Sequence, residues 1–339
     1  MISLVVLNYN GKRLIKTCLD SIARLNYKDK EVIFIDNASS DDSVEFVLKH
    51  YSSRNNGKPP VRVIANKKNS GYAGGANQAV RVSSGEFVMI LNPDIVFEPD
   101  YLEALVRRLK ADSGIGAIIG KLRKYDFEHG KKTNLIDSAG LEMLRNRRCV
   151  DRGQGEEDCG QYDRATEVFG VTGACPLYRR TALEDCKIGG VNGEYFDSDF
   201  FMYKEDVDIS WRMRLFGWKC FYEPKAVANH GRGTGVLSRA GVLEVAAGRS
   251  KLSKFSKFYS YKNERLMRVK NEFLTLVARD FLSILWKEIL MTGWILLREQ
   301  FLIKSFFKFL WQLPGALMKR REIMARVKVN AREMGKWFY

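Results

Sequence analysis

Short apolar runs alternate with helix-like periodicity over the first 120 residues. Continuous apolar runs are typical of buried strands, whereas apolar residues that recur every three or four positions are typical of helices. Strands are predicted over 2–7, 31–35, 61–65, 86–91 and 115–120, and helices over 14–25, 42–50, 73–82 and 100–110. Asp42 and Glu45 have the spacing of a capping box. This alternation predicts an α/β fold in which helices flank a mainly parallel sheet.

The pattern changes in the second half of the chain. Residues 125–165 lose periodicity and become charged and glycine-containing, which predicts an insertion or a loop. The elements predicted after it are strands at 167–173, 176–178 and 219–222 and a helix at 206–216, with a purely helical pattern from Lys251 onward. We therefore expect a sheet-containing domain over residues 1–240 and a helical region over 241–339.

Polar loops follow the first four predicted strands. They contain Asn8-Tyr9-Asn10-Gly11, Asp36-Asn37-Ala38-Ser39-Ser40, Asn69-Ser70-Gly71-Tyr72-Ala73-Gly74-Gly75-Ala76-Asn77 and Asn92-Pro93-Asp94. Any one of them could be an ordinary turn, because Asn, Asp, Gly and Ser dominate turns. Ligands in such sheets bind beyond the carboxyl ends of the strands, however, so four polar loops on one edge predict a binding site.

Two groups of carboxylates are candidates for chemistry. Asp94 follows an apolar strand in a proline-stiffened turn, which suits a ligand of Mg²⁺ or Mn²⁺; an Asx turn is the alternative. Glu205, Asp206, Asp208 and Arg212 open a predicted helix, where acids can simply complement the helix dipole. The aromatic residues just before them would raise the pKa of a carboxylate and favour a general base.

Histidine and glycine give weaker signals. His230, one of three histidines, lies in a glycine-rich turn, where a structural role competes with contact to a metal or a phosphate. The glycine stretch 71–75 matches neither the dinucleotide fingerprint nor the Walker P-loop, which argues against dehydrogenases and NTPases.

The cysteines and the N-terminus indicate the cellular compartment in which the protein works. The six cysteines are scattered without a zinc-binding spacing, so reduced thiols are expected. The first residues lack the basic and long apolar regions of a signal peptide, which predicts a cytoplasmic protein.

The ordered motifs resemble those of family 2 glycosyltransferases with the GT-A fold, and most closely the rhamnosyltransferase-like subgroup. The resemblance covers about residues 1–235 and rests on the four strand-end loops, Gly173-Ala174 with Arg179-Arg180, Glu205-Asp206-x-Asp208, and His230. It implies an inverting transfer of a sugar from a nucleotide sugar to an acceptor hydroxyl. L-rhamnose from dTDP-rhamnose is the leading donor, and a UDP-sugar is the alternative.

The resemblance also assigns roles to individual residues. Asp206, or else Glu205, would be the base, and Asp94 with His230 would hold a divalent cation, Mg²⁺ or Mn²⁺, although Asn92 replaces the first aspartate of a stricter D-x-D motif. Gly173, Ala174 and Asp208 would line the acceptor and donor pocket. The nucleotide sugar would contact Asn8, Tyr9, Asn10, Asp36, Asn69, Gly74, Gly75, Asn77, Asn92, Asp94 and Arg212.

Charge distribution points to where the protein works. The net charge is +16, but residues 251–339 hold 19 Lys+Arg and 7 Asp+Glu, so +12 belongs to this tail and +4 to the rest. Aromatic residues beside lysines, as in 301–311, are typical of an interfacial helix on anionic lipid. The segment 281–297 is short for a membrane span and carries Lys287 and Glu288 in its middle. The tail therefore predicts a peripheral protein on the inner face of the cell membrane. Together with this location, the resemblance implies a lipid-linked glycan acceptor in bacterial surface polysaccharide synthesis.

Several alternatives remain open. The tail could be an ordinary helical subdomain that packs on the body or forms a homodimer. Nucleic acid is not expected as a partner, because no recognisable binding module is present. A sugar nucleotidyltransferase would share the nucleotide-binding sheet, and a non-catalytic membrane adaptor would share the tail but not need the acids.

Overall fold

The computed structural model describes residues 1–52, 60–190, 193–232 and 248–339. Its centre is a mixed sheet with the strand order β10-β12-β6-β11-β4-β1-β2-β3, in which β5 also pairs with β12 and β7 with β6. The strands of this sheet are β1 (Ile2–Asn8), β2 (Lys30–Asp36), β3 (Val61–Ala65), β4 (Phe87–Leu91), β5 (Ile95–Phe97), β6 (Ile115–Asp126), β7 (Lys131–Ser138), β10 (Thr166–Val168), β11 (Leu177–Arg179) and β12 (Lys219–His230). A separate two-stranded sheet contains β8 (Leu141–Met143) and β9 (Cys149–Asp151).

The N-terminal half is parallel, as the alternation predicts. β1 pairs in parallel with β2 and with β4, and β2 with β3. Every residue of β1 and β4 is buried, which explains why both strands read as continuous apolar runs. The flanking helices of the sheet domain are α1 (Lys12–Ala23), α2 (Ser43–Tyr51), α3 (Gly71–Val82), α4 (Tyr101–Ala111), α5 (Arg180–Asp185) and α6 (Glu205–Leu215), with the short 3-10 helix η1 (Ser198–Phe200) before α6.

Several predicted elements need correction. The segment 125–165 is not a loop: it contains the end of β6 and the strands β7, β8 and β9, whose exposed turns hide the alternation expected of strands. The strand predicted at 167–173 shrinks to β10, whereas the one at 219–222 extends to His230 and pairs with β5 and β6. Asp42 precedes α2 without a side-chain cap and instead forms an ion pair with Lys12 at 2.6 Å.

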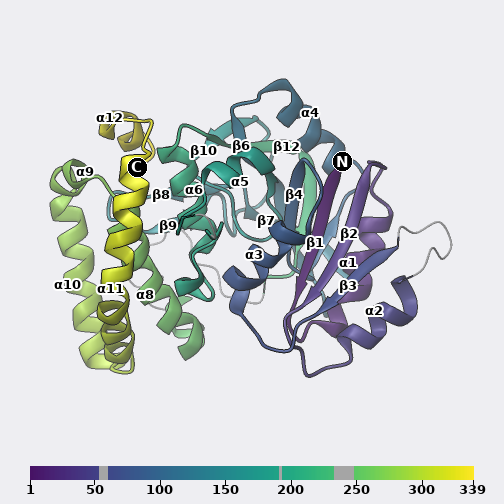
Figure 1. Cartoon of the computed structure of the whole chain (residues 1–339), viewed down its shortest axis with the longest axis horizontal. Coiled ribbons are helices and arrows are strands. Elements are labelled where there is room, and N and C mark those ends of the chain that lie inside the picture. Colours follow the sequence, from purple (N-terminus) through teal and green to yellow (C-terminus); the bar gives the residue numbers. More distant parts are fainter. Residues whose placement is uncertain (53–59, 191–192, 233–247) are drawn as a thin grey trace.

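The C-terminal region is helical, as predicted. Its helices are α8 (Lys254–Asn271), α9 (Leu274–Arg279), α10 (Phe281–Arg298), α11 (Leu302–Ala325) and α12 (Ala331–Gly335). Figure 1 shows α8, α10 and α11 side by side at the end of the molecule opposite β3. No helix within the described residues combines the length and apolar character needed to cross a bilayer.

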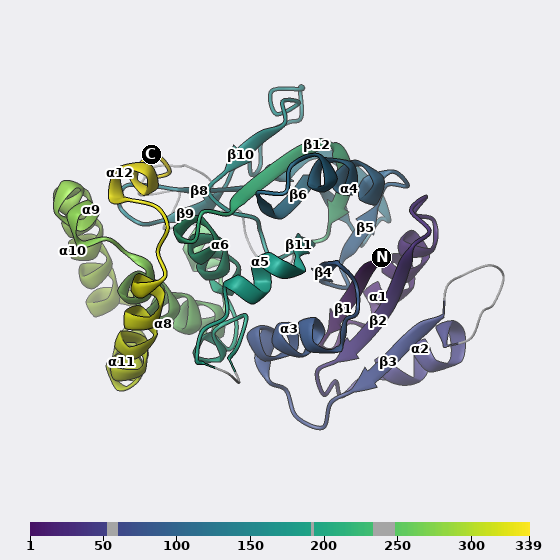
Figure 2. The ribbon, with the colours of Figure 1, turned by 45° about the horizontal axis from the view of Figure 1, so that its top comes forward.

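The C-terminal region is tied to the sheet domain at both of its ends. α8 packs against α6 and α11, and the backbone N–H of Tyr339 donates a 3.0 Å hydrogen bond to the carbonyl of Met143 in β8. Figure 2 shows the C-terminus beside β8 and β9. The predicted boundary between residues 240 and 241 lies outside the described residues, so the division into 1–240 and 241–339 stays a prediction.

Candidate active site

The strand-end loops meet at one edge of the sheet, as their sequence predicts. Asn8 at the end of β1 donates from Nδ2 to Oδ2 of Asp36 at the end of β2, at 2.8 Å. Asn37 donates in turn to Oδ1 of Asn69, at 3.0 Å, which links the loop after β2 to the loop after β3. The carboxyl ends of three neighbouring parallel strands therefore form one polar edge. Asn8 Oδ1 is buried there without a partner among the described residues.

Tyr9 and Asn10 are exposed beside this edge. The side chain of Tyr9 is 52% exposed, and Asn10 adopts a left-handed φ of 52° while its Oδ1 accepts a 2.8 Å hydrogen bond from the backbone N–H of Ser40. Gly11 follows with no room for a side chain, because a Cβ would lie 2.3 Å from Oδ1 of Asn8. The absence of a side chain at Gly11 lets the loop approach Asn8 closely, and the exposed ring of Tyr9 is available to a flat ligand.

Three residues predicted to contact the nucleotide sugar have structural roles, and their contact with a nucleotide sugar stays a prediction. Gly75 is buried where a Cβ would lie 2.5 Å from Leu7, so its small size lets α3 approach β1. Gly74 meets Ser70 in the same way, at 2.5 Å. Asn77 is buried and holds the chain before η1, donating to the carbonyl of Phe196 at 2.7 Å and accepting from its N–H at 3.0 Å.

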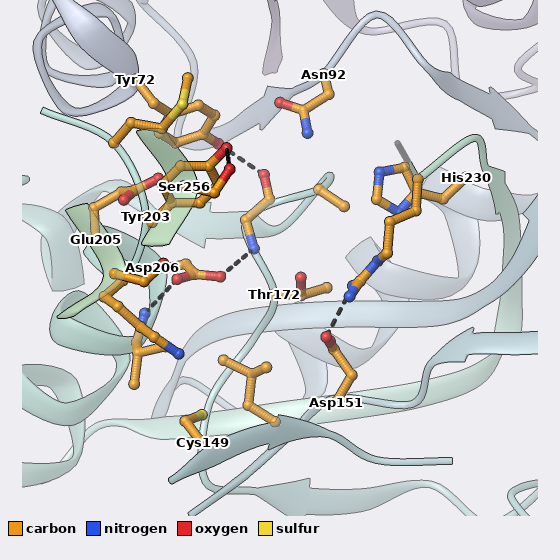
Figure 3. Close-up of a pocket in the computed structure, with 18 of the residues that line it drawn as sticks. Tyr72, Asn92, Cys149, Asp151, Thr172, Tyr203, Glu205, Asp206, His230 and Ser256 are labelled. Atoms are coloured by element: carbon orange, nitrogen blue, oxygen red, sulfur yellow. Dashed lines mark hydrogen bonds and ion pairs between the residues drawn. The ribbon is translucent and has the colours of Figure 1, made fainter. Parts of the chain in front are cut away.

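A cavity of about 410 Å³ lies beside the polar edge and collects most of the other predicted residues. Glu205 and Asp206 lie on one side of it and Asn92 and His230 on the other (Figure 3). Gly173, Ala174 and Asp94 also line it, as predicted. The chain thus brings the candidate base and the candidate metal ligands to opposite walls of one cavity.

Asp206 is held by backbone donors. Its Oδ2 accepts a 2.9 Å hydrogen bond from the N–H of Gly173, and its Oδ1 accepts one of 2.8 Å from the N–H of Val207. Burial raises the pKa of Asp206, while these two N–H groups and the charge of Lys204 oppose the rise. Two donors and a nearby cation favour the carboxylate form, which is the form that a general base needs.

Glu205 differs from its neighbour. It is buried, and its Oε2 has no hydrogen-bond partner among the described residues. Burial and the charge of Asp206 raise the pKa of Glu205 well above its ordinary value. Asp206 therefore has two N–H donors that favour its carboxylate form, whereas Oε2 of Glu205 has none, so Asp206 is the stronger candidate for the base.

Asp208 and Arg212 lie outside the cavity lining, in the interior. Both side chains are 0% exposed and form an ion pair at 3.1 Å, and Arg212 also donates to the carbonyl of Tyr195 at 2.7 Å. Lys270 and Asn271 of α8 contact the other oxygen of Asp208, at 3.0 and 2.7 Å. Arg212 thus holds a carboxylate of this helix in place, which is one of the two roles that the sequence allows, and its contact with phosphates stays a prediction.

His230 bridges two carboxylates. Its Nε2 lies 3.4 Å from Oδ2 of Asp94, and its Nδ1 lies 2.8 Å from Oδ2 of Asp137. Burial would lower the pKa of His230, but Asp94 and Asp137 outweigh burial and raise it to about 10. Arg232 continues the chain of charges to Asp137 at 2.9 Å and to Asp151 at 2.8 Å.

Asp94 retains a free oxygen. Its Oδ1 is buried in the cavity wall without a partner among the described residues. A carboxylate oxygen of this kind suits a hard divalent cation, which takes one or two carboxylates together with substrate phosphate oxygens. No group of three or more acidic, cysteine or histidine side chains with metal-site geometry occurs in the described ranges. Asp94 thus fits the cation as a single ligand, and a role for His230 as a further ligand stays a prediction.

Sequence reasoning missed the residues that β9 and α8 contribute. Asp151 and Cys149 come from the segment predicted as a loop, and Ser256 and Ser260 come from α8 in the region predicted as a separate tail. The hydroxyl of Tyr203 and Oγ of Ser256 lie 2.8 Å apart across this wall. Local periodicity carries no signal for such contacts between distant segments.

A strained loop leads into the acid pair. Phe201, Tyr203 and Lys204 all have left-handed φ angles, of 61°, 71° and 73°, which are unfavourable for residues other than glycine. Asn263 of α8 holds this loop by donating from Nδ2 to the carbonyls of Phe200, Met202 and Tyr203, at 2.9, 2.8 and 2.7 Å. The C-terminal helix α8 is therefore part of the candidate active site.

Known proteins similar to this chain are glycosyltransferases. The family described as Glycosyl transferase family 2 matches residues 3–187, more than half of the chain. Poly-beta-1,6-N-acetyl-D-glucosamine synthase of Staphylococcus epidermidis is 27% identical over 226 residues, which are 67% of this chain and 48% of that protein. The Staphylococcus aureus (strain COL) synthase is 27% identical over 219 residues, covering 65% and 47%. The chain spans about half the length of these curated relatives.

Solved structures resemble the fold at low sequence identity. The structure of S. aureus TarS 1–349 has a TM-score of 0.56 at 15% identity, covering 96% of this chain and 83% of that one. GalNAc-T7 with UDP, GalNAc and Mn2+ has a TM-score of 0.57 at 13% identity, covering 80% and 48%. These likenesses confirm the predicted GT-A fold, while the rhamnosyltransferase-like subgroup stays a prediction. From the extent of the family match, the chain belongs to glycosyl transferase family 2 and is a glycosyltransferase.

Proposed function

We propose that the chain is an inverting glycosyltransferase that moves a sugar from a UDP-sugar to an acceptor hydroxyl in the synthesis of a bacterial surface glycan. The observation that carries this proposal is the position of Asp206, whose carboxylate lines the same cavity as Asp94 and lies across it from His230, the neighbour of Asp94. An inverting transfer needs one base on the acceptor side and charge neutralisation at the leaving diphosphate. It needs no covalent nucleophile.

The nucleotide end of the donor is proposed to bind at the polar edge. Asn8, Asp36 and Asn10 offer amide and carboxylate groups, and the exposed ring of Tyr9 offers a stacking surface. A diphosphate placed from this edge toward Asn92 and Asp94 would bring the sugar to the cavity. Asp94 is the residue that would hold Mg²⁺ or Mn²⁺, which would supply positive charge against the leaving diphosphate.

The acceptor is proposed to enter beside Asp206. A hydroxyl within hydrogen-bond reach of this carboxylate would transfer its proton as it attacks the anomeric carbon from the face opposite the leaving group. Tyr72 supports the wall, because its hydroxyl donates a 2.7 Å hydrogen bond to the carbonyl of Gly173, whose N–H binds Asp206.

The similar proteins favour UDP-GlcNAc over dTDP-rhamnose as the sugar donor. The curated relatives are named as N-acetylglucosamine polymer synthases, and a TarS structure with a similar fold was solved with UDP-GlcNAc. UDP-GlcNAc is therefore the leading donor, and dTDP-rhamnose, expected from the motifs, becomes the second candidate. Family membership also argues against a sugar nucleotidyltransferase and a non-catalytic adaptor.

The lipid side of the proposal rests on the exposed face of α10 and α11. This apolar face comprises Phe281, Leu282, Leu285, Trp286, Ile289, Leu290, Leu296 and Leu297 on α10, and Ile303, Phe306, Phe307, Leu310, Trp311, Leu317 and Met318 on α11, all at least 38% exposed. The same region carries the +12 charge of the tail. An apolar face next to cations fits the inner, anionic surface of the cell membrane, where a lipid-linked acceptor would lie.

Vesicle binding separates this surface from a dimer interface. Replacing Leu282 and Trp286 together by glutamine should reduce sedimentation with phosphatidylglycerol vesicles while leaving the molecular mass unchanged. If the variant instead converted a dimer to a monomer without changing vesicle binding, the apolar face would be a dimer interface.

A screen of nucleotide sugars tests the proposed function. Thermal stability and donor hydrolysis would be measured with UDP-GlcNAc, other UDP-sugars and dTDP-rhamnose, each with and without Mn²⁺ or Mg²⁺. We expect UDP-sugars to raise the midpoint of unfolding and to be hydrolysed slowly. If no nucleotide sugar bound or was turned over, the proposal would fail.

A further inference from the structure

A second cavity, of about 420 Å³, lies between η1 and the helices α8 and α11. We call it the α8–α11 cavity. Phe201 lines it, whereas the following residues, from Met202 to Val207, line the active-site cavity, so the strained loop separates the two. Figure 1 shows α8 and α11 adjacent over their length. The α8–α11 cavity is lined by Ser198, Asp199, Phe201, Phe258, Tyr259, Lys262, Lys308, Trp311 and Gln312.

Two lysines line this cavity without a carboxylate partner. Lys262 is only 1% exposed, and its Nζ donates a 2.7 Å hydrogen bond to the backbone carbonyl of Asp199. Nζ of Lys308 lies 3.8 Å from the centroid of the Trp311 ring. Neither lysine forms an ion pair within the described part of the chain. A buried cation without an opposite charge costs free energy, which binding of an anion would recover.

The one carboxylate in the lining is already neutralised. Oδ2 of Asp199 forms a 2.9 Å ion pair with Lys319, and its Oδ1 accepts a 2.9 Å hydrogen bond from Nε2 of Gln312. Burial lowers the pKa of Lys262 to about 8, and the nearby charge of Lys308 adds to this effect, although Asp199 and Asp197 oppose it. The lining of the α8–α11 cavity therefore holds two lysines against one carboxylate, which is already paired with Lys319.

Gln312 adds an acceptor to the same wall. The residue is 8% exposed, and its Oε1 is buried with no hydrogen-bond partner among the described residues, while Nε2 is engaged by Asp199. A ligand that satisfies both features needs an anionic group for the lysines and a hydroxyl or amide donor for Oε1.

The rim of the cavity joins the apolar face. Trp311, which lines the cavity, is 72% exposed, and Phe307 next to Lys308 is 64% exposed. A ligand bound here would therefore touch an exposed apolar surface on one side and, on the other, the buried Lys262 and the exposed Lys308. This combination matches a phosphate attached to a lipid better than a free phosphate ion, which has no apolar part.

We propose that the α8–α11 cavity binds the phosphate of an anionic lipid headgroup, with Lys262 and Lys308 on the phosphate and Gln312 on a headgroup hydroxyl. Such a site would fix the depth and rotation of the enzyme at the membrane and so turn the active-site cavity toward a lipid-linked acceptor. The inference rests on the proposed membrane association, but it makes a separate prediction about individual lysines.

Variants that each remove one lysine charge distinguish a specific headgroup site from general electrostatic attraction between the basic tail and an anionic membrane. Binding to phosphatidylcholine vesicles with and without phosphatidylglycerol would be measured for the whole chain and for Lys308→Gln, Lys262→Gln and Lys304→Gln. Lys304 is exposed one helical turn before Lys308 and does not line the cavity, so its variant removes the same charge from the same helix. We expect Lys304→Gln to weaken binding about fivefold and each cavity variant to weaken it roughly tenfold or more.

Three outcomes would overturn the proposal. One is equal weakening by Lys308→Gln and Lys304→Gln, because the site would then add nothing to surface charge. Another is that Lys262→Gln loses vesicle binding because the variant unfolds, while Lys308→Gln weakens binding no more than the control Lys304→Gln does. The third is that soluble glycerol phosphate stabilises the enzyme against unfolding as strongly as vesicles do. The cavity would then be assigned to a soluble compound.

The test is independent of catalysis. Hydrolysis of UDP-GlcNAc, measured in parallel without lipid, should be the same for the whole chain and all three variants. If the unmodified enzyme bound anionic vesicles through these lysines but turned over no nucleotide sugar, the proposed function would fail while the headgroup site would stand.

Discussion

The backbone N–H of Gly173 donates a 2.9 Å hydrogen bond to Oδ2 of Asp206 and joins the loop after β10 to the first turn of α6. This contact fixes the carboxylate at the wall of the active-site cavity and favours its charged form. Glu205, one residue earlier, has no such donor on Oε2. The different surroundings of these two neighbours lead to predictions that separate their roles.

Replacing Glu205 by glutamine should have a small effect on catalysis. Burial and the charge of Asp206 raise the pKa of Glu205 well above its ordinary value, which favours the protonated form, and glutamine has nearly the same shape as that form. We expect kcat to fall by less than about tenfold, well below the loss expected for a general base. Steady-state kinetics with a UDP-sugar would measure it, and a loss of a thousandfold would show that Glu205 is the base.

The same variant should change how stability depends on pH. A carboxyl whose pKa is raised on folding binds more protons in the folded state, so its stabilising effect is complete below the unfolded value of 4.5 and is lost as pH rises toward the folded value. The free energy of unfolding should therefore fall with rising pH over that interval in the unmodified protein and fall less in Glu205→Gln. Urea unfolding at several pH values would measure the difference, and parallel curves would refute it.

Lys204 should set the acidic limit of activity. Its charge lowers the pKa of Asp206, which burial raises above 3.8. A base works only when deprotonated, so kcat should rise with pH through the pKa of Asp206, and Lys204→Gln should move this rise to higher pH. Lys254→Gln is a suitable control, because Lys254 is exposed and does not line the active-site cavity. An unchanged pH profile in Lys204→Gln would contradict the assignment.

Asn263 should stabilise the strained loop. Asn263→Ala removes the donor to the carbonyls of Phe200, Met202 and Tyr203 and leaves buried polar groups unpaired. The free energy of unfolding should fall by about 2–4 kcal/mol. Gln300→Ala, which removes an exposed hydrogen bond to Leu296, should change it by less than about 0.5 kcal/mol. Urea unfolding would compare the two, and similar values would mean that the loop does not depend on Asn263.

Asp94 should determine the response to metal. If its free oxygen binds Mg²⁺ or Mn²⁺ together with the diphosphate, removal of divalent cations should abolish transfer and added Mn²⁺ should restore it. Asp94→Asn should need more Mn²⁺ for half-maximal activity, whereas it should leave binding of free uridine nearly unchanged. Full activity of the unmodified enzyme in a strong chelator would exclude the metal.

The predictable parts of the site are those that follow from strand ends. Asn8 and Asp36 end neighbouring parallel strands, so the apolar runs before them suffice to bring them together. Parallel pairing thus converts such positions in the sequence into neighbours in space. Asp94 and His230 meet for another reason, because Ile95 of β5 pairs with His230 of β12 in an antiparallel ladder.

Other parts could not be predicted from local patterns. The sequence motif groups Asp208 and Arg212 with Asp206. Asp208 and Arg212 are four residues apart and share a helix face, whereas Asp206 and Asp208 are two apart and do not, so Asp208 and Arg212 lie together in the interior. Asp137 and Asp151 lie in short strands whose charged turns conceal any alternation. Ser256 and Asn263 reach the site because α8 packs on α6, a contact between distant segments that no local pattern encodes.

The most direct test of the central claim compares the unmodified enzyme with Asp206→Asn in release of UDP from UDP-GlcNAc with a glycan acceptor. Asparagine keeps the shape of the side chain but cannot accept the proton. The account predicts that both proteins bind UDP equally well and unfold alike, while kcat of the variant falls by roughly a thousandfold. Transfer by Asp206→Asn at a rate near that of the unmodified enzyme would contradict it.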